Sequence, residues 1–143
     1  NRDIVLLGLF IHDLGKVVEL CWDKGFQYTR EGSLIGHIAR GAMWLEEKAK
    51  VAESSLGNPL PDGFLTVLQH IVLSHHGQLE HGAAKVPSTP EAMFVSQLDT
   101  LDAHVQTSLD VARPWEQSVT GDEAFTERIW SLNTKIYKRD PLG

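Results

Sequence analysis

The sequence has a single cysteine, no long apolar run and no block of basic residues, and each absence excludes a class of protein. Cys21 has no second cysteine with which to form an internal disulfide, which fits the reducing cytoplasm. The nearest approach to a membrane span, residues 4–11, is far shorter than the ~20 apolar residues that cross a bilayer. We therefore expect a cytoplasmic protein that does not enter a membrane.

The formal net charge is −6, and lysine and arginine do not gather into a stripe that could hold a nucleic-acid backbone alone. If the substrate is a nucleic acid, another segment must grip it. A chain of 143 residues with 42% apolar and 22% charged residues fits one compact domain. Because the first residue is Asn1 and an apolar helical pattern has begun by Ile4, we expect residues 1–143 to be a fragment of a longer protein.

Apolar residues recur at three- and four-residue spacing along most of the chain, which predicts an all-α helical bundle. The predicted helices cover residues 4–15, 33–52, 62–77 and 88–109, and the last three begin at the N-caps Ser33, Asp62 and Ser88. Between the first two helices, residues 20–32 mix aromatic residues with glycine and predict a loop or a short hairpin. From residue 115 onward, a helix and short extended segments fit the pattern equally, so both stay open.

Histidines and aspartates lie at the ends or on the inward faces of these helices. They are His12, Asp13, His37, His75, His76 and Asp99. A helical bundle can direct such residues to one point, and imidazole and carboxylate groups are ligands for Zn, Fe, Mn and Ni. Asp13 follows a candidate ligand directly and carries two oxygens, so it can bridge two ions ~3.5–4 Å apart. The pattern predicts a two-metal centre.

Two acidic residues could orient a ligand histidine without binding metal themselves. Asp102 lies three residues after Asp99 on the same side of a helix, and we favour Asp99 as the ligand. Glu80, close in sequence to the adjacent histidines, could take a similar orienting role. The residues expected to be structural or solvated are His70, His81, His104, Glu19 and Glu31.

Four short motifs occur in an order that resembles the HD-domain metal-dependent phosphohydrolases. They are HDLGK at 12–16, GHI at 36–38, SHHG at 74–77 and LDTLDA at 98–103. The longer stretches YTREGSLIGHI, LQHIVLSHHGQLEHG, TPEAMFVSQLDTLDA and FTERIW are similar to the HD domain of the bacterial YhaM-type 3'-to-5' exoribonucleases. Those enzymes join an OB-fold to an HD domain, so the resemblance implies an OB-fold upstream of residues 1–143.

The resemblance also implies roles for individual residues. The six histidines and aspartates correspond to metal ligands, Asp13 and Lys16 to catalytic residues, and Lys16 to the lysine that contacts the scissile phosphate. The implied reaction releases nucleoside monophosphates from single-stranded RNA with two divalent ions. Manganese is the expected working metal, and iron, nickel, zinc or cobalt could occupy the same positions. HD proteins also supply a ligand histidine from a preceding helix, whereas no histidine precedes His12.

Two other functions stay open on the sequence. The same kind of metal centre serves phosphomonoesters and phosphodiesters, so a hydrolase of nucleotides or cyclic nucleotides fits as well. A non-catalytic regulatory HD module would fit the acidic charge and the missing upstream histidine. The stretch after SHHG reads LEHGAAKVP, where the related exoribonucleases are expected to carry a tryptophan and a Ser-Pro pair. The sequence does not indicate an oligomeric state.

Overall fold

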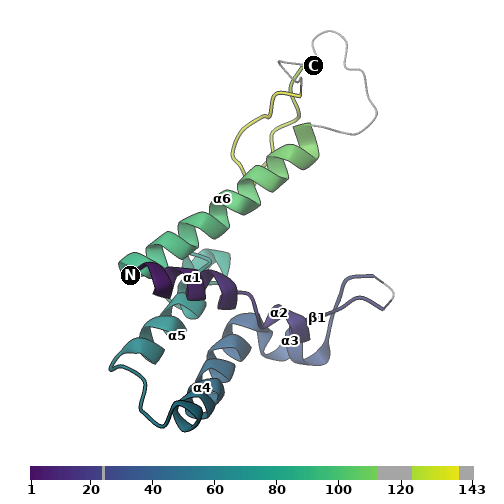
Figure 1. Ribbon diagram of the computed structural model, residues 1–143. Helices are drawn as coiled ribbons and strands as arrows, with labels where there is room; N and C mark the ends of the chain where they lie inside the picture. Colours follow the sequence, from purple (N-terminus) through teal and green to yellow (C-terminus); the bar gives the residue numbers. More distant parts are fainter. Residues whose placement is uncertain (24, 113–123, 139–143) are drawn as a thin grey trace. The chain divides into compact units, whose positions relative to one another are not determined.

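The computed structural model describes residues 1–23, 25–112 and 124–138, and the predicted all-α fold is confirmed. The elements, in chain order, are α1 (Arg2–Ile11), α2 (Lys16–Glu19), β1 (Leu20–Cys21), β2 (Gln27–Tyr28), α3 (Arg30–Leu34), α4 (Gly36–Leu56), α5 (Phe64–Ser74), the 3-10 helix η1 (Leu79–His81) and α6 (Pro90–Ala112) (Figure 1). The chain divides into two compact units, Asn1–Asp99 and Thr100–Gly143. In the described ranges, no helix combines the length and the apolar character needed to cross a membrane.

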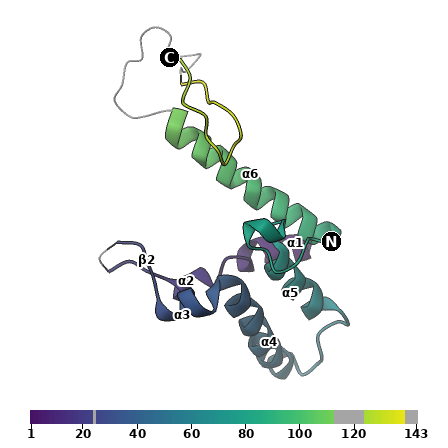
Figure 2. The same cartoon turned by 180° about the vertical axis from the view of Figure 1, so that it is seen from behind.

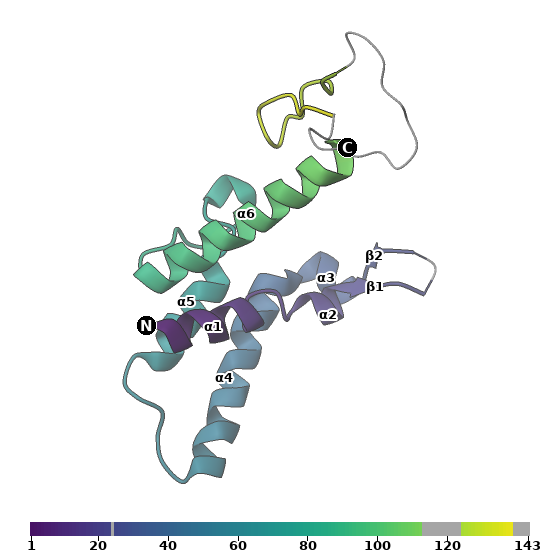
Figure 3. The same ribbon diagram turned by 45° about the horizontal axis from the view of Figure 1, so that its top comes forward.

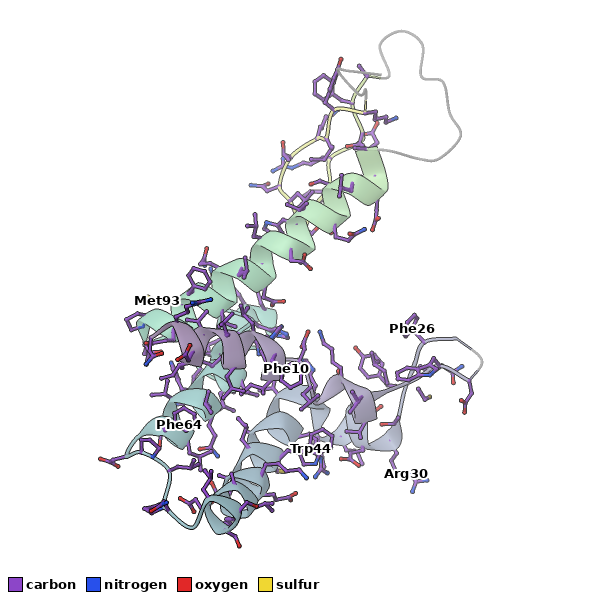
Figure 4. The ribbon with its side chains drawn as sticks, viewed as in Figure 1. Phe10, Phe26, Arg30, Trp44, Phe64 and Met93 are labelled. Atoms are coloured by element: carbon purple, nitrogen blue, oxygen red, sulfur yellow. The ribbon has the colours of Figure 1, made fainter. Side chains whose placement is uncertain are left out.

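The first unit is built on the antiparallel pair of α4 and α5, and α1 lies across α5 (Figure 3). Gly8 permits this close approach, because a Cβ there would lie 3.0 Å from a methyl carbon of Ile71 in α5. Trp44 in α4 and Phe64 at the start of α5 line an apolar pocket beside these helices (Figure 4). The buried apolar core consists of Ile11, Leu68, Ile71, Val72, Ala92 and Val95.

The first helix ends earlier than the apolar pattern predicted. α1 stops at Ile11, and His12 caps it by donating its backbone N–H to the Gly8 carbonyl. The prediction that the helix runs on to Gly15 was wrong, because four residues of turn separate α1 from α2. His12 and Asp13 therefore lie in the turn between α1 and α2.

The short hairpin predicted within residues 20–32 is confirmed. β1 and β2 pair antiparallel, with Leu20 opposite Tyr28 and Cys21 opposite Gln27. Figure 2 shows β2 leading into α3 and then into α4. Ser33, predicted as the N-cap of a long helix, lies inside α3 instead; Thr29 caps α3 by accepting the N–H of Gly32.

The other two predicted N-caps, Asp62 and Ser88, were each wrong by one residue. Gly63, not Asp62, precedes α5, and its positive φ of 73° is a conformation that glycine adopts without strain. At α6 the cap is Thr89, whose hydroxyl accepts the N–H of Ala92, and Pro90 takes the first helical position.

The described part of the C-terminal region adopts the extended alternative. Within the second unit, antiparallel bridges join Phe125 to Tyr137 and Ile129 to Thr134. The rest of the predicted region, residues 115–123 and 139–143, lies outside the described residues.

Candidate metal centre

All six residues predicted as metal ligands meet in the unit Asn1–Asp99. The turn after α1 supplies two of them, the first turn of α4 one, the end of α5 two, and α6 one. The potential ligand atoms form two groups, each with its atoms within 4.8 Å of one another. The first group is His37, His75 and His76, and the second is His12, Asp13 and Asp99.

Asp13 lies between the two groups and presents one oxygen to each. Its Oδ1 is 3.5 Å from His37 Nε2 and 3.5 Å from His75 Nε2, both of the first group. Its Oδ2 is 3.6 Å from His12 Nε2, in its own group. Asp99 approaches the same His12 nitrogen, with its Oδ1 at 3.7 Å. This is the arrangement that a carboxylate bridging two ions requires.

Each of the four histidine rings has its Nδ1 occupied by an oxygen of the protein. His12 and His75 bond the carbonyl oxygens three residues before them, both at 2.8 Å. His76 bonds the carbonyl of His81 at 3.1 Å, and His37 bonds the carboxylate of Glu19 at 2.9 Å. Because a neutral imidazole that donates through Nδ1 has a free lone pair on Nε2, all four rings are oriented as metal ligands through Nε2.

Three buried atoms at the middle of the centre lack a hydrogen-bond partner among the described residues. They are Asp13 Oδ1, His37 Nε2 and His75 Nε2. Buried polar atoms are normally satisfied, since leaving one without a partner costs roughly 1–3 kcal/mol. Two imidazole nitrogens that each lie 3.5 Å from one carboxylate oxygen suit a shared cation, and this ligand chemistry fits a divalent transition metal.

The surroundings of Asp13 and Asp99 favour the ionised carboxylates, which is the form that binds metal. Burial opposes the ionisation of Asp13, but the neighbouring His75 and the Lys16 ammonium outweigh it and hold its pKa well below the ordinary value. His12 lowers the pKa of Asp99, and Asp99 in turn raises the pKa of His12. Burial, together with the neighbouring histidines, lowers the pKa of His76. A bound cation would replace the proton that His12 otherwise attracts.

Lys16 lies at the edge of the centre, one turn after Asp13. Its Nζ donates to Asp13 Oδ2 at 2.7 Å, and its side chain is 43% exposed. An ammonium group that contacts the Asp13 carboxylate and also faces solvent can reach an anion that approaches the centre.

Glu19 was missed in the sequence, and its interpretation as a solvated residue was wrong. It is 8% exposed, the carboxylate contacts the ring of His37, and Oε1 also accepts the backbone N–H of His37 at 3.0 Å. Burial opposes its ionisation, but the hydrogen bonds from His37 outweigh it and lower the pKa. The available signal was an acidic residue inside the otherwise apolar stretch 17–20, one turn after Lys16.

The remaining candidates belong to neither group of potential ligand atoms among the described residues. Glu80 is exposed in η1 and makes no side-chain hydrogen bond or ion pair with any described residue. Asp102 belongs to the unit Thr100–Gly143 and is exposed. His70 is structural, since its Nε2 accepts the N–H of Ser88. His81 contributes its backbone carbonyl to His76, while its own side chain is exposed.

One family of known proteins matches most of this chain. The sequence model of a family described as "HD domain" matches residues 1–104, a span that contains every residue of both ligand groups. No solved structure matches the chain.

Several curated relatives share the name 3'-5' exoribonuclease YhaM. The protein from Geobacillus sp. (strain WCH70) is 41% identical over 142 residues, covering 96% of this chain and 40% of that protein. The Bacillus pumilus protein is 40% identical over 142 residues, covering 96% and 41%. The Listeria welshimeri protein is 36% identical over 137 residues, covering 96% and 40%. The chain thus spans about two fifths of the length of these relatives.

Proposed function

We propose that this chain, which belongs to the HD-domain family, carries the metal centre of a 3'-to-5' exoribonuclease that releases nucleoside monophosphates from single-stranded RNA. The observation that carries the proposal is the placement of Asp13, whose two oxygens face two separate groups of ligand atoms. The shared name of the relatives supports the exonuclease reaction and RNA as the substrate.

HD domains bind divalent metals, and the histidine and aspartate groups of this chain fit that role. In our proposal His37, His75 and His76 would hold one ion and His12 and Asp99 a second, and Asp13 would contribute a ligand to both. Manganese is the proposed working metal. When bound, two divalent ions acidify water and neutralise phosphate oxygens, which is the chemistry that phosphodiester hydrolysis needs.

The residues of the chain prepare this chemistry in three ways. His75 and Lys16 hold the pKa of Asp13 below its ordinary value despite burial, so both of its oxygens stay available even in mildly acidic solution. The four rings keep Nε2 directed inward because Nδ1 is anchored to the protein. Lys16 provides a positive charge that can move from Asp13 to a phosphate oxygen, where negative charge accumulates during the reaction.

The grip on RNA belongs, in this proposal, to parts of the longer protein. The net charge of −6 and the scattered basic residues give this chain little attraction for a polyanion. An OB-fold upstream would supply a surface on which single-stranded bases stack. A histidine from a preceding helix would complete the second ion position, and the cytoplasm is the proposed location.

The test is the digestion of a 5'-labelled single-stranded RNA in the presence of Mn²⁺. Stepwise shortening with release of nucleoside monophosphates is expected from the wild-type protein. Asp13→Ala should abolish shortening and metal retention together, because the bridging ligand is lost. Asp62→Ala, which changes an exposed aspartate in the loop before α5, is the matched control and should behave as wild type.

Three results would contradict the proposal in distinguishable ways. Hydrolysis of mononucleotides or cyclic nucleotides without shortening of RNA would indicate a nucleotide hydrolase. Metal binding without any hydrolysis would indicate a regulatory module. Full activity and full metal content in Asp13→Ala would exclude the proposed centre.

A further inference from the structure

The ring of His37 is anchored differently from the other three rings of the centre. His12, His75 and His76 donate from Nδ1 to backbone carbonyls, which are neutral acceptors close in sequence. His37 donates to a carboxylate that lies eighteen residues away, with Glu19 Oε2 at 2.9 Å and Oε1 at 3.0 Å from Nδ1. A hydrogen bond with an ionised acceptor is roughly twice as strong as one with a neutral acceptor.

The position of His37 in the chain explains why it needs a distant partner. His12 and His75 use the carbonyl three residues earlier, which a continuous helix or turn places beneath the ring. Three residues before His37 the chain is still in α3, and Gly36, with a φ of 77°, breaks the path between α3 and α4. The local backbone therefore does not place a carbonyl at the required point.

Two glycines pack closely against the backbone of Glu19 and His37. A Cβ on Gly32 would lie 2.3 Å from the carbonyl oxygen of Glu19, and a Cβ on Gly15 would lie 2.2 Å from the carbonyl oxygen of His37. The backbone of Glu19 is further fixed by the N–H of Thr29, which donates to its carbonyl at 2.9 Å. Both partners of the hydrogen bond are thus held by backbone contacts that leave little room for movement.

From these contacts we infer that Glu19 is a positioning residue of the metal centre. Its carboxylate accepts the Nδ1–H of His37 and so directs Nε2 toward Asp13 Oδ1, 3.5 Å away. Through this ring Glu19 acts on the ion position formed by His37, His75 and His76. The inference rests on the metal centre proposed above, and it is independent of which phosphate ester the centre hydrolyses.

A purely structural role is the competing explanation, because Glu19 also accepts the backbone N–H of His37 in the first turn of α4. Ile35, the residue before α4, makes no side-chain capping hydrogen bond. Glu19 therefore caps this helix from eighteen residues away in the sequence. A residue that only caps α4 would affect the stability of the fold and leave the protonation of the ring and the affinity for metal unchanged.

The experiment compares wild type, Glu19→Gln and a control variant in metal-free chains labelled with ¹⁵N at histidine. Long-range ¹H–¹⁵N spectra report which ring nitrogen carries the proton. Titration with Co²⁺, followed by visible absorption, and with Mn²⁺, followed by calorimetry, reports metal affinity. Glutamine keeps the size of the side chain and an acceptor for the backbone N–H, so the fold should persist. The control is Glu31→Gln, because Glu31 is a nearby glutamate that pairs with Arg40 rather than with a histidine.

In the wild type, His37 should carry its proton on Nδ1. In Glu19→Gln that preference should weaken, and one of the two ions should bind about 10- to 100-fold less tightly, the usual effect of losing a partner that orients a ligand. Glu31→Gln should bind both ions as wild type does. Unchanged affinity in Glu19→Gln, or equal weakening in Glu31→Gln, would overturn the inference.

The wild-type spectrum keeps the inference testable even if Glu19→Gln does not fold, because a His37 ring that carries its proton on Nε2 and none on Nδ1 would overturn it alone. Failure of the proposed function gives a different pattern. If the full-length protein leaves RNA intact while Glu19→Gln still weakens Co²⁺ binding, the exonuclease is refuted and the positioning role is supported.

Discussion

Alanine at position 15 is a sharp test of the packing that brings His37 to the centre. Gly15 has helical backbone angles, with a φ of −61°, so its conformation is open to any residue. Considered locally, the change should stabilise the chain by roughly 0.5–1 kcal/mol, because alanine loses less conformational freedom than glycine on folding. The close contact between Gly15 and the backbone of His37 predicts a loss of stability instead.

The magnitude follows from the space around the missing side chain. A Cβ on Gly15 would lie 2.2 Å from the His37 carbonyl oxygen and 2.8 Å from two of its backbone carbons, whereas real Cβ contacts stay above 3.0 Å. The turn that carries Asp13 and the start of α4 must therefore separate by about 0.8 Å. Overpacking of this kind costs ~1–3 kcal/mol, which exceeds the local gain.

The effect on the metal centre should be larger than the effect on stability. Metal-ligand distances tolerate only about ±0.2 Å, so a shift of about 0.8 Å between Asp13 and His37 removes one of them from a shared ion. A misplacement of ~1 Å at a reacting centre lowers the rate by ~10²-fold. We expect a Gly15→Ala chain that is folded, somewhat less stable, and at least tenfold weaker in binding Mn²⁺.

The assay combines urea denaturation of the metal-free chain with calorimetric titration of Mn²⁺. Gly41→Ala is the control, since Gly41 is also helical and a Cβ there would meet only a methyl group of Val72, at 3.1 Å. That variant should keep its metal affinity. A Gly15→Ala chain that is more stable than wild type and binds Mn²⁺ equally well would refute the contact between the turn and His37.

Three further predictions concern charged side chains and the apolar core of the first unit. Lys16→Met should retain both ions but lower turnover by ~10²- to 10³-fold, the usual cost of losing one group that stabilises developing charge; an unchanged rate would remove it from the mechanism. In the metal-free chain, the raised pKa of His12 means that its attraction to Asp99 stabilises the fold below about pH 6.5 and is lost as the pH rises through the folded value. Asp99→Asn should therefore lose stability at pH 6 and little at pH 9, and a deficit independent of pH would contradict the pairing. Ile71→Ala, at a fully buried position, should lower the free energy of unfolding by about 2–5 kcal/mol in urea denaturation, and a loss under 1 kcal/mol would place Ile71 outside the core.

The sequence was sufficient to predict the four longest helices and the candidate ligand residues that come together in the structure, because both are local patterns. Apolar spacing located the cores of α1, α4, α5 and α6, although the ends of these helices shifted. Helix ends depend on which backbone groups find a partner, and that choice involves Thr89 and Gly63 rather than their neighbours Ser88 and Asp62. The motif histidines and aspartates stood out because such residues are uncommon on the inward faces of helices.

Only the tertiary structure could show that Glu19 contacts the ring of His37. Its partner, His37, is eighteen residues away, beyond a hairpin and a short helix, and no periodic pattern links two residues across that distance. The same is true of Gly15 and Gly32, which the sequence suggests are ordinary turn or helix-end glycines. Their importance comes from backbone segments that approach too closely for a Cβ.

The two oxygens of Asp13 give the clearest division between sequence and structure. The sequence determined that a carboxylate follows His12 and could bridge two ions, since this depends on residue type and order. Which oxygen faces which histidines was decided by the packing of α1, α4 and α5, because that packing sets the distances between side chains that lie far apart in the chain.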